Sequence, residues 1–336
     1  MTGLAARVDA LAAETAYSGV VSVTSGNDTI HRRAYGVAHQ AHEIDNTIQT
    51  RFGLASGTKG LTALVIASLV ETGVLSFETT ARSLLGDDLP LIDDAVTIDH
   101  LLTHRSGIGD YLDEDTELDL DAYLLTVPAH QLDSTASYLT VLDGFPSKSS
   151  PGERFSYCNG GYVVLALLAE RASGLRFGQL VQDLVCGPAG MTDTAFSRSD
   201  QLPARTATGY LQIDGVWRSN VFHLPVLGSG DGGVYSTVAD VGAFWSALYA
   251  GRLVAPSLVT ELVTTCSTLP DSDYAYGRGF WLHPKVATVE LQGSDAGVSF
   301  RSIHDPARDL TCTVLSNTSD GAWPIARLLA GELNLT

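Results

Sequence analysis

Lysine is nearly absent from this chain of 336 residues and occurs only at positions 59, 148 and 285. The 38 acidic residues outnumber the 20 lysines and arginines, which gives a formal net charge of −18. A surface of this sign repels a phosphate backbone or an anionic bilayer. We therefore expect no nucleic-acid partner and interpret the acidity as a solvated surface.

Cysteine is also scarce, and the four cysteines form no C-x-x-C pair. Their spacing favours neither a zinc cage nor a redox dithiol. Since no cluster of histidine, cysteine and carboxylate residues has the spacing of metal ligands, we predict no metal and no organic cofactor. Four reduced cysteines are typical of a cytoplasmic protein.

Long hydrophobic runs are missing as well. Leu61–Val70 and Gly161–Leu168 fall short of the roughly 18 apolar residues that span a bilayer. Met1–Glu14 carries apolar residues at helical spacing and lacks the unbroken apolar stretch of a secretory signal. The sequence thus predicts a soluble protein that is not exported and has no membrane partner.

The chain has enough apolar sequence, 45% of its residues, for one large domain or two closely packed ones. Strand patterns lie at both ends, which indicates one sheet built from both termini. The expected strands are Tyr17–Thr24, Thr29–Val37, Gly279–His283, Val286–Leu291, Val298–His304 and Leu310–Ser316.

The middle of the chain is predicted to be mainly helical. Asp110–Leu142 is acidic and weakly periodic, without a strand signal. Glycines close the helical patterns, as expected at helix ends. The expected helices run from near Ser56 to Gly73, over Gly160–Ala172, over about Thr237–Tyr249, and over Ala322–Leu333.

The candidate nucleophile is Ser56, because Ser56-Gly57-Thr58-Lys59 is the only Ser-x-x-Lys sequence in the chain. A serine hydroxyl needs a base within reach, and residues three apart on a helix lie roughly 5–6 Å apart between Cβ atoms. Lys59 is followed by an apolar run, so burial is expected to prepare its amine as a base. The alternative is a surface lysine whose stem lies along the helix.

The second candidate element is Tyr157-Cys158-Asn159, the only Tyr-x-Asn in the chain. Side chains two apart on an extended segment can face one cavity, where a phenol relays a proton and an amide orients substrate and lysine. The alternative is a core tyrosine followed by an asparagine that caps a helix at Gly160.

Five segments then follow one another in a characteristic order. They are Phe52-Gly53-Leu54-Ala55-Ser56-Gly57-Thr58-Lys59, Leu101-Leu102-Thr103-His104-Arg105-Ser106-Gly107, Phe155-Ser156-Tyr157-Cys158-Asn159-Gly160-Gly161-Tyr162, Gly232-Gly233-Val234-Tyr235-Ser236-Thr237 and His304-Asp305-Pro306. From about residue 18 to the end, the chain resembles the serine β-lactamase and penicillin-binding-protein superfamily. The resemblance is to class C β-lactamases, D,D-peptidases and the related family VIII carboxylesterases.

This resemblance implies a β-lactamase-like fold: an antiparallel sheet built from both termini and flanked by helices, with an inserted, mainly helical domain. The expected α/β domain comprises residues 1–85 and 265–336, and the helical domain residues 86–264. The active site would lie in the cleft between them. By resemblance Ser56 is the nucleophile, Lys59 and Tyr157 share the acid and base work, and Asn159 orients the substrate.

The chain departs from the family at the third motif. Where the resemblance implies Lys-Thr-Gly or His-x-Gly on the strand beside the site, the chain has Leu291-Gln292-Gly293. A cation that helps to hold a substrate carboxylate is missing, unless Arg301 on the following strand replaces it. Gly293 still permits close backbone approach, so we predict that the N–H of Ser294 joins that of Ser56 as an oxyanion hole. Gln292, Gly293 and Ser294 are therefore predicted to bind substrate.

Other residues have a structural interpretation. His104 and His304 are expected to hold the framework, and Gly228–Gly233 lacks the lysine of a phosphate-binding loop. The chain has no Gly-x-Ser-x-Gly sequence, which argues against an α/β-hydrolase triad. The aromatic residues that either line an acyl pocket or pack in the core are Tyr111, Phe222, Tyr235 and Trp281.

The sequence therefore predicts a serine hydrolase that forms an acyl-enzyme on Ser56, with a carboxylesterase for small neutral esters as the leading hypothesis. A β-lactamase, a D-amino-acid peptidase or amidase, and a transacylase would use the same residues. A hypothesis of another class is a non-catalytic ligand sensor of penicillin-binding type.

Overall fold

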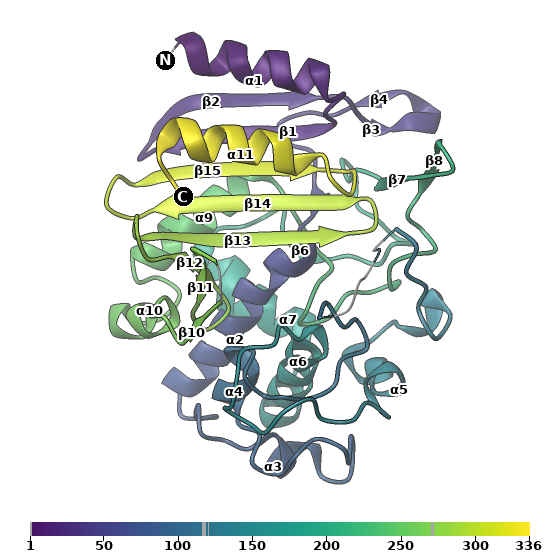
Figure 1. The fold of residues 1–336 in the computed structure, drawn as a ribbon, viewed down its shortest axis with the longest axis vertical. Coiled ribbons are helices and arrows are strands. Elements are labelled where there is room, and N and C mark those ends of the chain that lie inside the picture. Colours follow the sequence, from purple (N-terminus) through teal and green to yellow (C-terminus); the bar gives the residue numbers. More distant parts are fainter. Residues whose placement is uncertain (1, 116–118, 120, 270–271) are drawn as a thin grey trace.

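The computed structural model describes residues 2–115, 119, 121–269 and 272–336. Within them an eight-stranded antiparallel sheet has the order β10-β11-β12-β13-β14-β15-β1-β2, so strands from the two chain ends pair directly (Figure 1). This confirms the predicted sheet built from both termini. Its strands are β1 (Gly19–Ser25), β2 (Asp28–Tyr35), β10 (Ser267–Thr268), β11 (Ala275–Tyr276), β12 (Trp281–His283), β13 (Thr288–Asp295), β14 (Val298–Asp305) and β15 (Leu310–Ser316).

Helices cover both faces of the sheet, because its central strands alternate between two apolar clusters. Val21 and Val314 join a cluster with helices α1 (Thr2–Glu14) and α11 (Ala322–Leu333), which lie on one face. Their neighbours Val20 and Leu315 join the larger cluster on the other face. Figure 1 shows α11 in front of the sheet and α1 along its β2 edge.

The larger cluster is organised around helix α2 (Thr58–Glu71), which is buried from its first residue to Leu69. A helix that is apolar on every side belongs in a core, and α2 therefore lies between the sheet and the other helices. The remaining helices are α3 (Ala81–Leu85), α4 (Ile98–Leu102), α5 (Leu139–Leu142), α6 (Asn159–Ser173), α7 (Phe177–Val181), α8 (Gly187–Ala189), α9 (Val238–Tyr249) and α10 (Pro256–Leu262). Short 3-10 helices lie at Gln40–His42, Ala55–Gly57, Ala129–Gln131 and Thr135–Tyr138, and a π-helical turn at Gln182–Cys186.

Among the described residues, seven short strands outside the main sheet were not predicted, four of them in the segment expected to be mainly helical. Two to four residues are too few for an alternating pattern to show in the sequence. They form the pair β3 (Val37–His39) and β4 (Ile44–Asp45), a small sheet of β5 (Phe52–Gly53), β9 (Val234–Ser236) and β6 (Ala195–Phe196), and the hairpin β7 (Tyr210–Ile213) with β8 (Val216–Ser219).

The expected strand Val286–Leu291 is shifted to Thr288–Asp295, because Ala287 has a φ of 55° and belongs to the turn. In the expected strandless segment Asp110–Leu142, residues 116–118 and 120 lie outside the described residues. The division into domains at residues 85 and 264 stays a prediction. Among the described residues, no helix has the length and apolar character needed to traverse a bilayer.

Candidate active site

Ser56 lies in the short 3-10 helix Ala55–Gly57, which connects β5 to the buried helix α2. The turn is tight, with Ala55 at a φ of 43°. Only glycine fits at position 57, since a Cβ there would stand 2.3 Å from the ring of Phe300 on β14. The turn therefore holds the Ser56 hydroxyl at the junction of helix and sheet.

Lys59 is buried, with 2% of its surface exposed, so the alternative of a surface lysine is wrong. Its Nζ donates hydrogen bonds to Ser56 Oγ at 2.9 Å, Asn159 Oδ1 at 2.8 Å and the backbone oxygen of Asp231 at 2.9 Å. The last two atoms are obligate acceptors. In its amine form Lys59 has two N–H groups for them, and its lone pair then faces the Ser56 hydroxyl. The role of Lys59 as a general base for Ser56 stays a prediction, with which this geometry agrees.

The ring of Tyr157 lies beside the lysine, with Nζ 4.9 Å from its centroid. It stacks on Trp281 at 5.9 Å between centroids and contacts His104 at 4.2 Å with the two rings tilted by 34°. Burial raises the pKa of Tyr157 well above its usual range, Glu114 adds to the rise, and a hydrogen bond with Ser56 opposes it. Tyr157 is therefore protonated, and its role as a proton donor stays a prediction.

Asn159 is the first residue of α6 and holds the lysine in place. Its Oδ1 accepts from Lys59, and its Nδ2 donates to Leu112 O at 3.1 Å and to Glu114 Oε1 at 2.9 Å. The alternative interpretation of Asn159, as the residue that caps helix α6, is wrong. Cys158 caps it through its Sγ, and Asp110 accepts the first two amides of the helix.

Segment 110–115 completes the site and was not predicted. Lys148 Nζ donates to Asp113 at 2.7 Å and to Asp115 at 2.8 Å, and Ser156 Oγ donates to Asp115 at 2.6 Å. These contacts fix both neighbours of Glu114, the residue that orients the amide of Asn159. The acidic run from Asp113 was visible in the sequence, but its contact with Tyr-x-Asn is a tertiary feature.

Strand β13 brings Gly293 against Ser56. A Cβ at Gly293 would stand 2.3 Å from Leu54 O and 2.6 Å from Ser56 N, so only glycine permits this approach. Gln292, Gly293 and Ser294 line one cavity together with Ser56 and Tyr157. The structure thus brings all seven sequence-predicted residues together, while the oxyanion hole stays a prediction.

The third motif supplies no cation. Leu291 is 4% exposed and packs against Gly60 of α2, where a Cβ would approach its Cδ2 to 2.5 Å. Arg301 does not replace the missing charge, because Glu290 holds it with two hydrogen bonds of 2.8 Å and Tyr274 with one of 2.9 Å. Neither side chain is therefore available to bind a substrate carboxylate, because Leu291 packs against α2 and Arg301 is bound by Glu290 and Tyr274.

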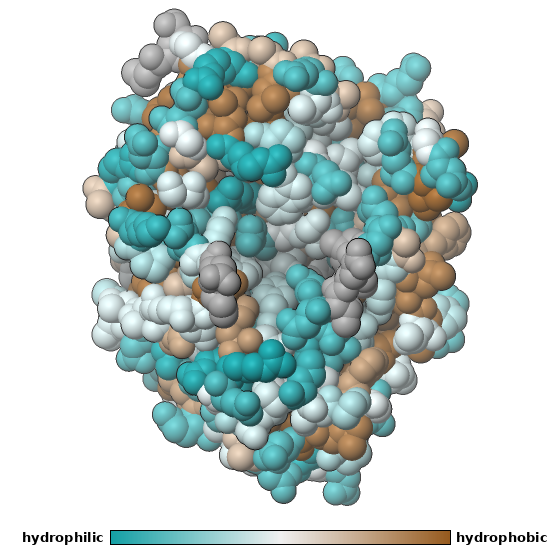
Figure 2. Space-filling view, in the orientation of Figure 1, coloured by the Kyte–Doolittle hydropathy of each residue, from teal (hydrophilic) through white to brown (hydrophobic). Residues whose placement is uncertain are grey.

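A second cavity, about 870 Å³ including its open mouth, adjoins Ser56 on the side of Tyr111 and Tyr235. Figure 2 shows the molecular surface hollowed below the sheet. Acidic side chains line this cavity: Glu114, Asp231 and Asp295. Burial raises the pKa of Asp295 to about 7, with the Asp231 carboxylate adding to the rise.

The two histidines and the four aromatic residues that were singled out in the sequence lie in different environments. His104 is buried, its Nδ1 accepts the Cys158 amide at 3.0 Å, and burial lowers its pKa well below the usual value. His304 pairs with Thr311 at 2.9 Å, and its pKa is lowered by burial to about 4. Both occupy framework positions. Phe222 is 82% exposed and lies outside the cavities, whereas the other three aromatic residues border them: Tyr111, Tyr235 and Trp281.

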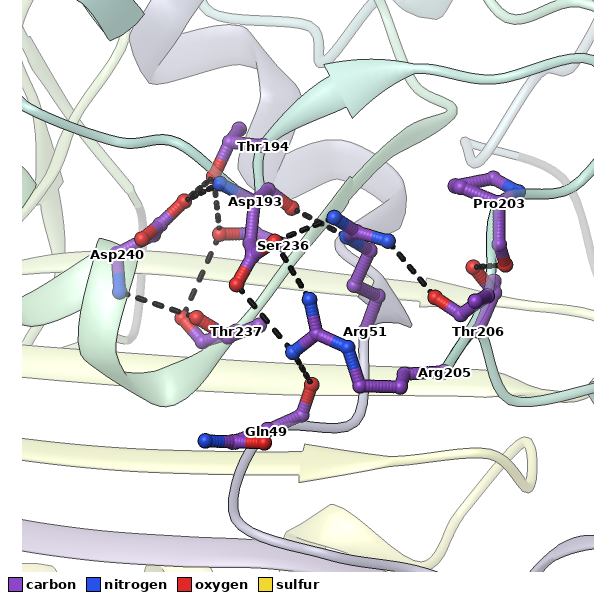
Figure 3. Close-up of polar contacts among 11 residues, drawn as sticks. Gln49, Arg51, Asp193, Thr194, Pro203, Arg205, Thr206, Ser236, Thr237 and Asp240 are labelled. Atoms are coloured by element: carbon purple, nitrogen blue, oxygen red, sulfur yellow. Dashed lines mark hydrogen bonds and ion pairs between the residues drawn. The ribbon is translucent and has the colours of Figure 1, made fainter.

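A polar network anchors the small sheet that leads into Ser56. Figure 3 shows Arg51, directly before β5, and Arg205 converging on Asp193. The Asp193 amide in turn donates to Asp240 of α9 at 2.8 Å. Burial opposes the ionisation of Asp193, but the two arginines outweigh it and lower its pKa. The approach of the chain to the nucleophile is thereby tied to two other elements.

This combination of a buried Ser-x-x-Lys helix, a Tyr-x-Asn segment and a flanking antiparallel sheet defines a class of serine hydrolases. A family model described as Beta-lactamase matches residues 4–333. The chain therefore belongs to the Beta-lactamase family, whose members include serine esterases, amidases and peptidases. Among the described residues, no group of three histidine, cysteine or carboxylate side chains could hold a metal ion.

Three known proteins illustrate the relationship. Penicillin-binding protein 4* of Bacillus subtilis (strain 168) is 29% identical over 335 residues, which cover 94% of this chain and 72% of that protein. Esterase EstB of Burkholderia gladioli is 32% identical over 218 residues, covering 62% of this chain and 55% of EstB. The crystal structure of a penicillin-binding protein from Bacillus halodurans superposes with a TM-score of 0.91 at 34% identity, covering 97% of this chain and 99% of that one.

Proposed function

We propose that the chain is a carboxylesterase that forms an acyl-enzyme on Ser56 and acts on esters without a carboxylate. The observation that carries this proposal is the Nζ of Lys59, which lies 2.9 Å from Ser56 Oγ and is held by two further acceptors. A buried lysine so oriented is a base directed at one hydroxyl. The similarity to esterase EstB supports the same activity.

In the proposed mechanism, Ser56 Oγ attacks the ester carbonyl carbon while its proton passes to the Lys59 amine. The backbone N–H groups of Ser56 and Ser294 stabilise the oxyanion. When the ester bond breaks, Tyr157 donates its proton to the leaving alkoxide and recovers one from the Lys59 ammonium. Water then attacks the acyl carbon by the same route, which releases the acid and restores the free serine.

The charges around Ser56 support a substrate without a carboxylate. In the part of the chain that the structure describes, no lysine or arginine lines either cavity beside Ser56. Three acidic residues line the larger cavity instead, and ionised carboxylates repel an anionic substrate. This argues against β-lactams and D-alanyl peptides as preferred substrates, since both carry a carboxylate.

The same acidic lining favours a second candidate, hydrolysis of D-amino-acid amides or peptides with a free amine. A protonated amine would be attracted by Asp231 and Asp295, and the ring faces of Tyr111 and Tyr235 in the same cavity also suit a cation. The catalytic residues are unchanged in this alternative. Comparing acetyl and D-alanyl p-nitroanilides distinguishes the two.

Covalent labelling and turnover test the proposal together. The wild type is expected to gain the mass of one fluorophosphonate adduct and to hydrolyse short p-nitrophenyl esters. Ser56→Ala should lose both properties, whereas Ser83→Ala, at an exposed serine on α3, should retain both. Labelling of another serine in Ser56→Ala would exclude Ser56 as the nucleophile and, with it, this mechanism.

A further inference from the structure

A second compartment, at the β7–β8 hairpin, adjoins the catalytic cavity. Both cavities are lined by Ser199, Asn220, Val221 and Tyr235, so they share one wall. Ser56 lines only the first of them. In Figure 1 the hairpin lies at the side of the molecule, beyond the end of β14. The two cavities adjoin along these residues, and together they form the groove from Ser56 to the hairpin through which an acyl chain would pass.

The second compartment differs from the first in its chemistry. Among the described residues that line it there is no lysine, arginine, aspartate or glutamate. Its wall combines the apolar or aromatic side chains of Leu202, Tyr210, Trp217 and Val221 with uncharged polar ones, among them Gln40, Thr208 and Asn220. Trp217 and Val221 are each 47% exposed, an unusual arrangement for two large apolar side chains at the mouth of one groove. The compartment therefore suits an uncharged group whose apolar end lies against Trp217 and Val221.

The position of the proton donor determines which part of an ester faces this groove. Tyr157 lines the cavity with Trp281 and Trp323, and it does not line the cavity that leads to the hairpin. A leaving alkoxide must lie next to the group that protonates it. The alcohol part of the ester is therefore on the Tyr157 side, and the acyl part extends the other way, toward Tyr235.

We propose that the compartment at the β7–β8 hairpin binds the apolar end of the substrate's acyl group. This inference rests on the proposed acyl-enzyme at Ser56 and names its substrate class: esters of medium-chain or aryl-alkyl acids. We expect a butyryl group to end within the catalytic cavity and an octanoyl group to be long enough to reach the shared wall and contact Trp217. Each methylene that leaves water there strengthens binding in the transition state.

The test compares p-nitrophenyl butyrate with p-nitrophenyl octanoate, below the solubility limit of each. We expect the wild type to have a kcat/KM at least about tenfold higher for octanoate. Trp217→Ala should reduce this ratio to about threefold or less. Val216→Ala is the matched control, because Val216 is 56% exposed on the same hairpin, points to its other face and lines neither cavity.

A ratio that is close to one in the wild type, or that survives in Trp217→Ala, would overturn the inference and leave the esterase proposal intact. A binding measurement tests the compartment independently of turnover, in case the proposed esterase function is wrong. On Ser56→Ala, which cannot turn over, calorimetry should show octanamide binding at least about tenfold more tightly than butyramide, and the additional Trp217→Ala substitution should abolish the difference. Preferential binding without ester turnover by the wild type would refute the proposed function alone.

Discussion

Gly293 and Ser56 approach each other so closely that a Cβ at position 293 would stand 2.6 Å from the Ser56 amide nitrogen. Real Cβ atoms do not approach backbone atoms to this distance, so strand β13 or the serine turn must move if a side chain is added. This contact sets the distance between strand β13 and Ser56.

Gly293→Ala is therefore expected to lower kcat on p-nitrophenyl butyrate by about 100-fold or more, since displacing one oxyanion donor has an effect of this order. Gly242→Ala is the matched control, because a Cβ added at Gly242, in α9, would meet no atom within 4 Å. Steady-state kinetics of both variants check the prediction. A Gly293→Ala enzyme with a normal kcat would place the oxyanion hole elsewhere.

Lys148 is expected to act on the reaction through Glu114. Its contacts with Asp113 and Asp115 fix the turn that carries Glu114, which orients the Asn159 amide that holds Lys59. Lys148→Ala should lower kcat/KM about tenfold, because small misplacements of catalytic groups have large effects on rate. The change should appear mainly in kcat, with KM little altered.

The matched control for Lys148 is Lys285→Ala, which removes an exposed ion pair with Asp273. An exposed pair of this kind contributes little, so the kinetics of this variant should equal those of the wild type. Lys148→Arg should recover part of the lost rate. If Lys148→Ala lowers only the melting temperature, Lys148 is structural and does not position the site.

The local parts of the site were predictable from the sequence, and the tertiary parts were not. Ser56 and Lys59 share one helical turn, so their contact follows from a spacing of three. The strands at both ends of the chain were also predictable, because the alternation of apolar and polar residues is visible within a short stretch of sequence. By contrast, Glu114 meets Asn159 across 45 positions, and no local pattern reports such a contact.

The burial of Leu291 could not be predicted either. Which face of a strand meets a helix depends on the packing of the helix, here on the space left by Gly60. The alternative in which Arg301 replaces the missing cation is wrong, because Glu290 on the neighbouring strand β13 is its partner. Charge pairs between strands depend on register, which the sequence alone left open.

Asp295 is expected to make the stability of the protein depend on pH. Burial raises its pKa to about 7, whereas an aspartate in the unfolded chain has a pKa of about 3.9. Between these values the folded state keeps a proton that the unfolded state has lost. The contribution of this group to stability is therefore complete below about pH 4, falls as the pH rises and is lost above about pH 7.

Asp295→Asn removes the ionisable group, so it should raise the melting temperature at pH 8 by about two degrees or more relative to the wild type. At pH 4.5 the difference should be much smaller. The control is Asp214→Asn, in the exposed β7–β8 turn, whose effect should be the same at both pH values. Equal shifts for Asp295→Asn at pH 4.5 and pH 8 would mean that Asp295 is ionised over the whole range.

The last prediction concerns the substrate carboxylate. A charge-assisted hydrogen bond from a cation to such a carboxylate contributes roughly 1.5–3 kcal/mol, which corresponds to about one to two orders of magnitude in rate. Here Leu291 is buried and Arg301 is bound by Glu290, so neither supplies that bond. The nearby Asp295 adds repulsion at pH 8, where it is ionised.

We therefore expect kcat/KM for a neutral short-chain ester such as p-nitrophenyl butyrate to exceed that for benzylpenicillin by at least about tenfold. The matched substrate is benzylpenicillin methyl ester, which keeps the β-lactam ring and lacks the charge, so it should acylate Ser56 faster than the free acid. At pH 8, Asp295→Asn should raise kcat/KM for benzylpenicillin, because it removes a repelling carboxylate. The kcat/KM for the neutral ester should stay unchanged, so the ratio between the two substrates should fall. Stopped-flow acylation and steady-state rates on the purified protein measure all three. If benzylpenicillin reacts as fast as p-nitrophenyl butyrate and faster than its own methyl ester, the site contains a cationic contact for the carboxylate, and the preference for uncharged esters is wrong.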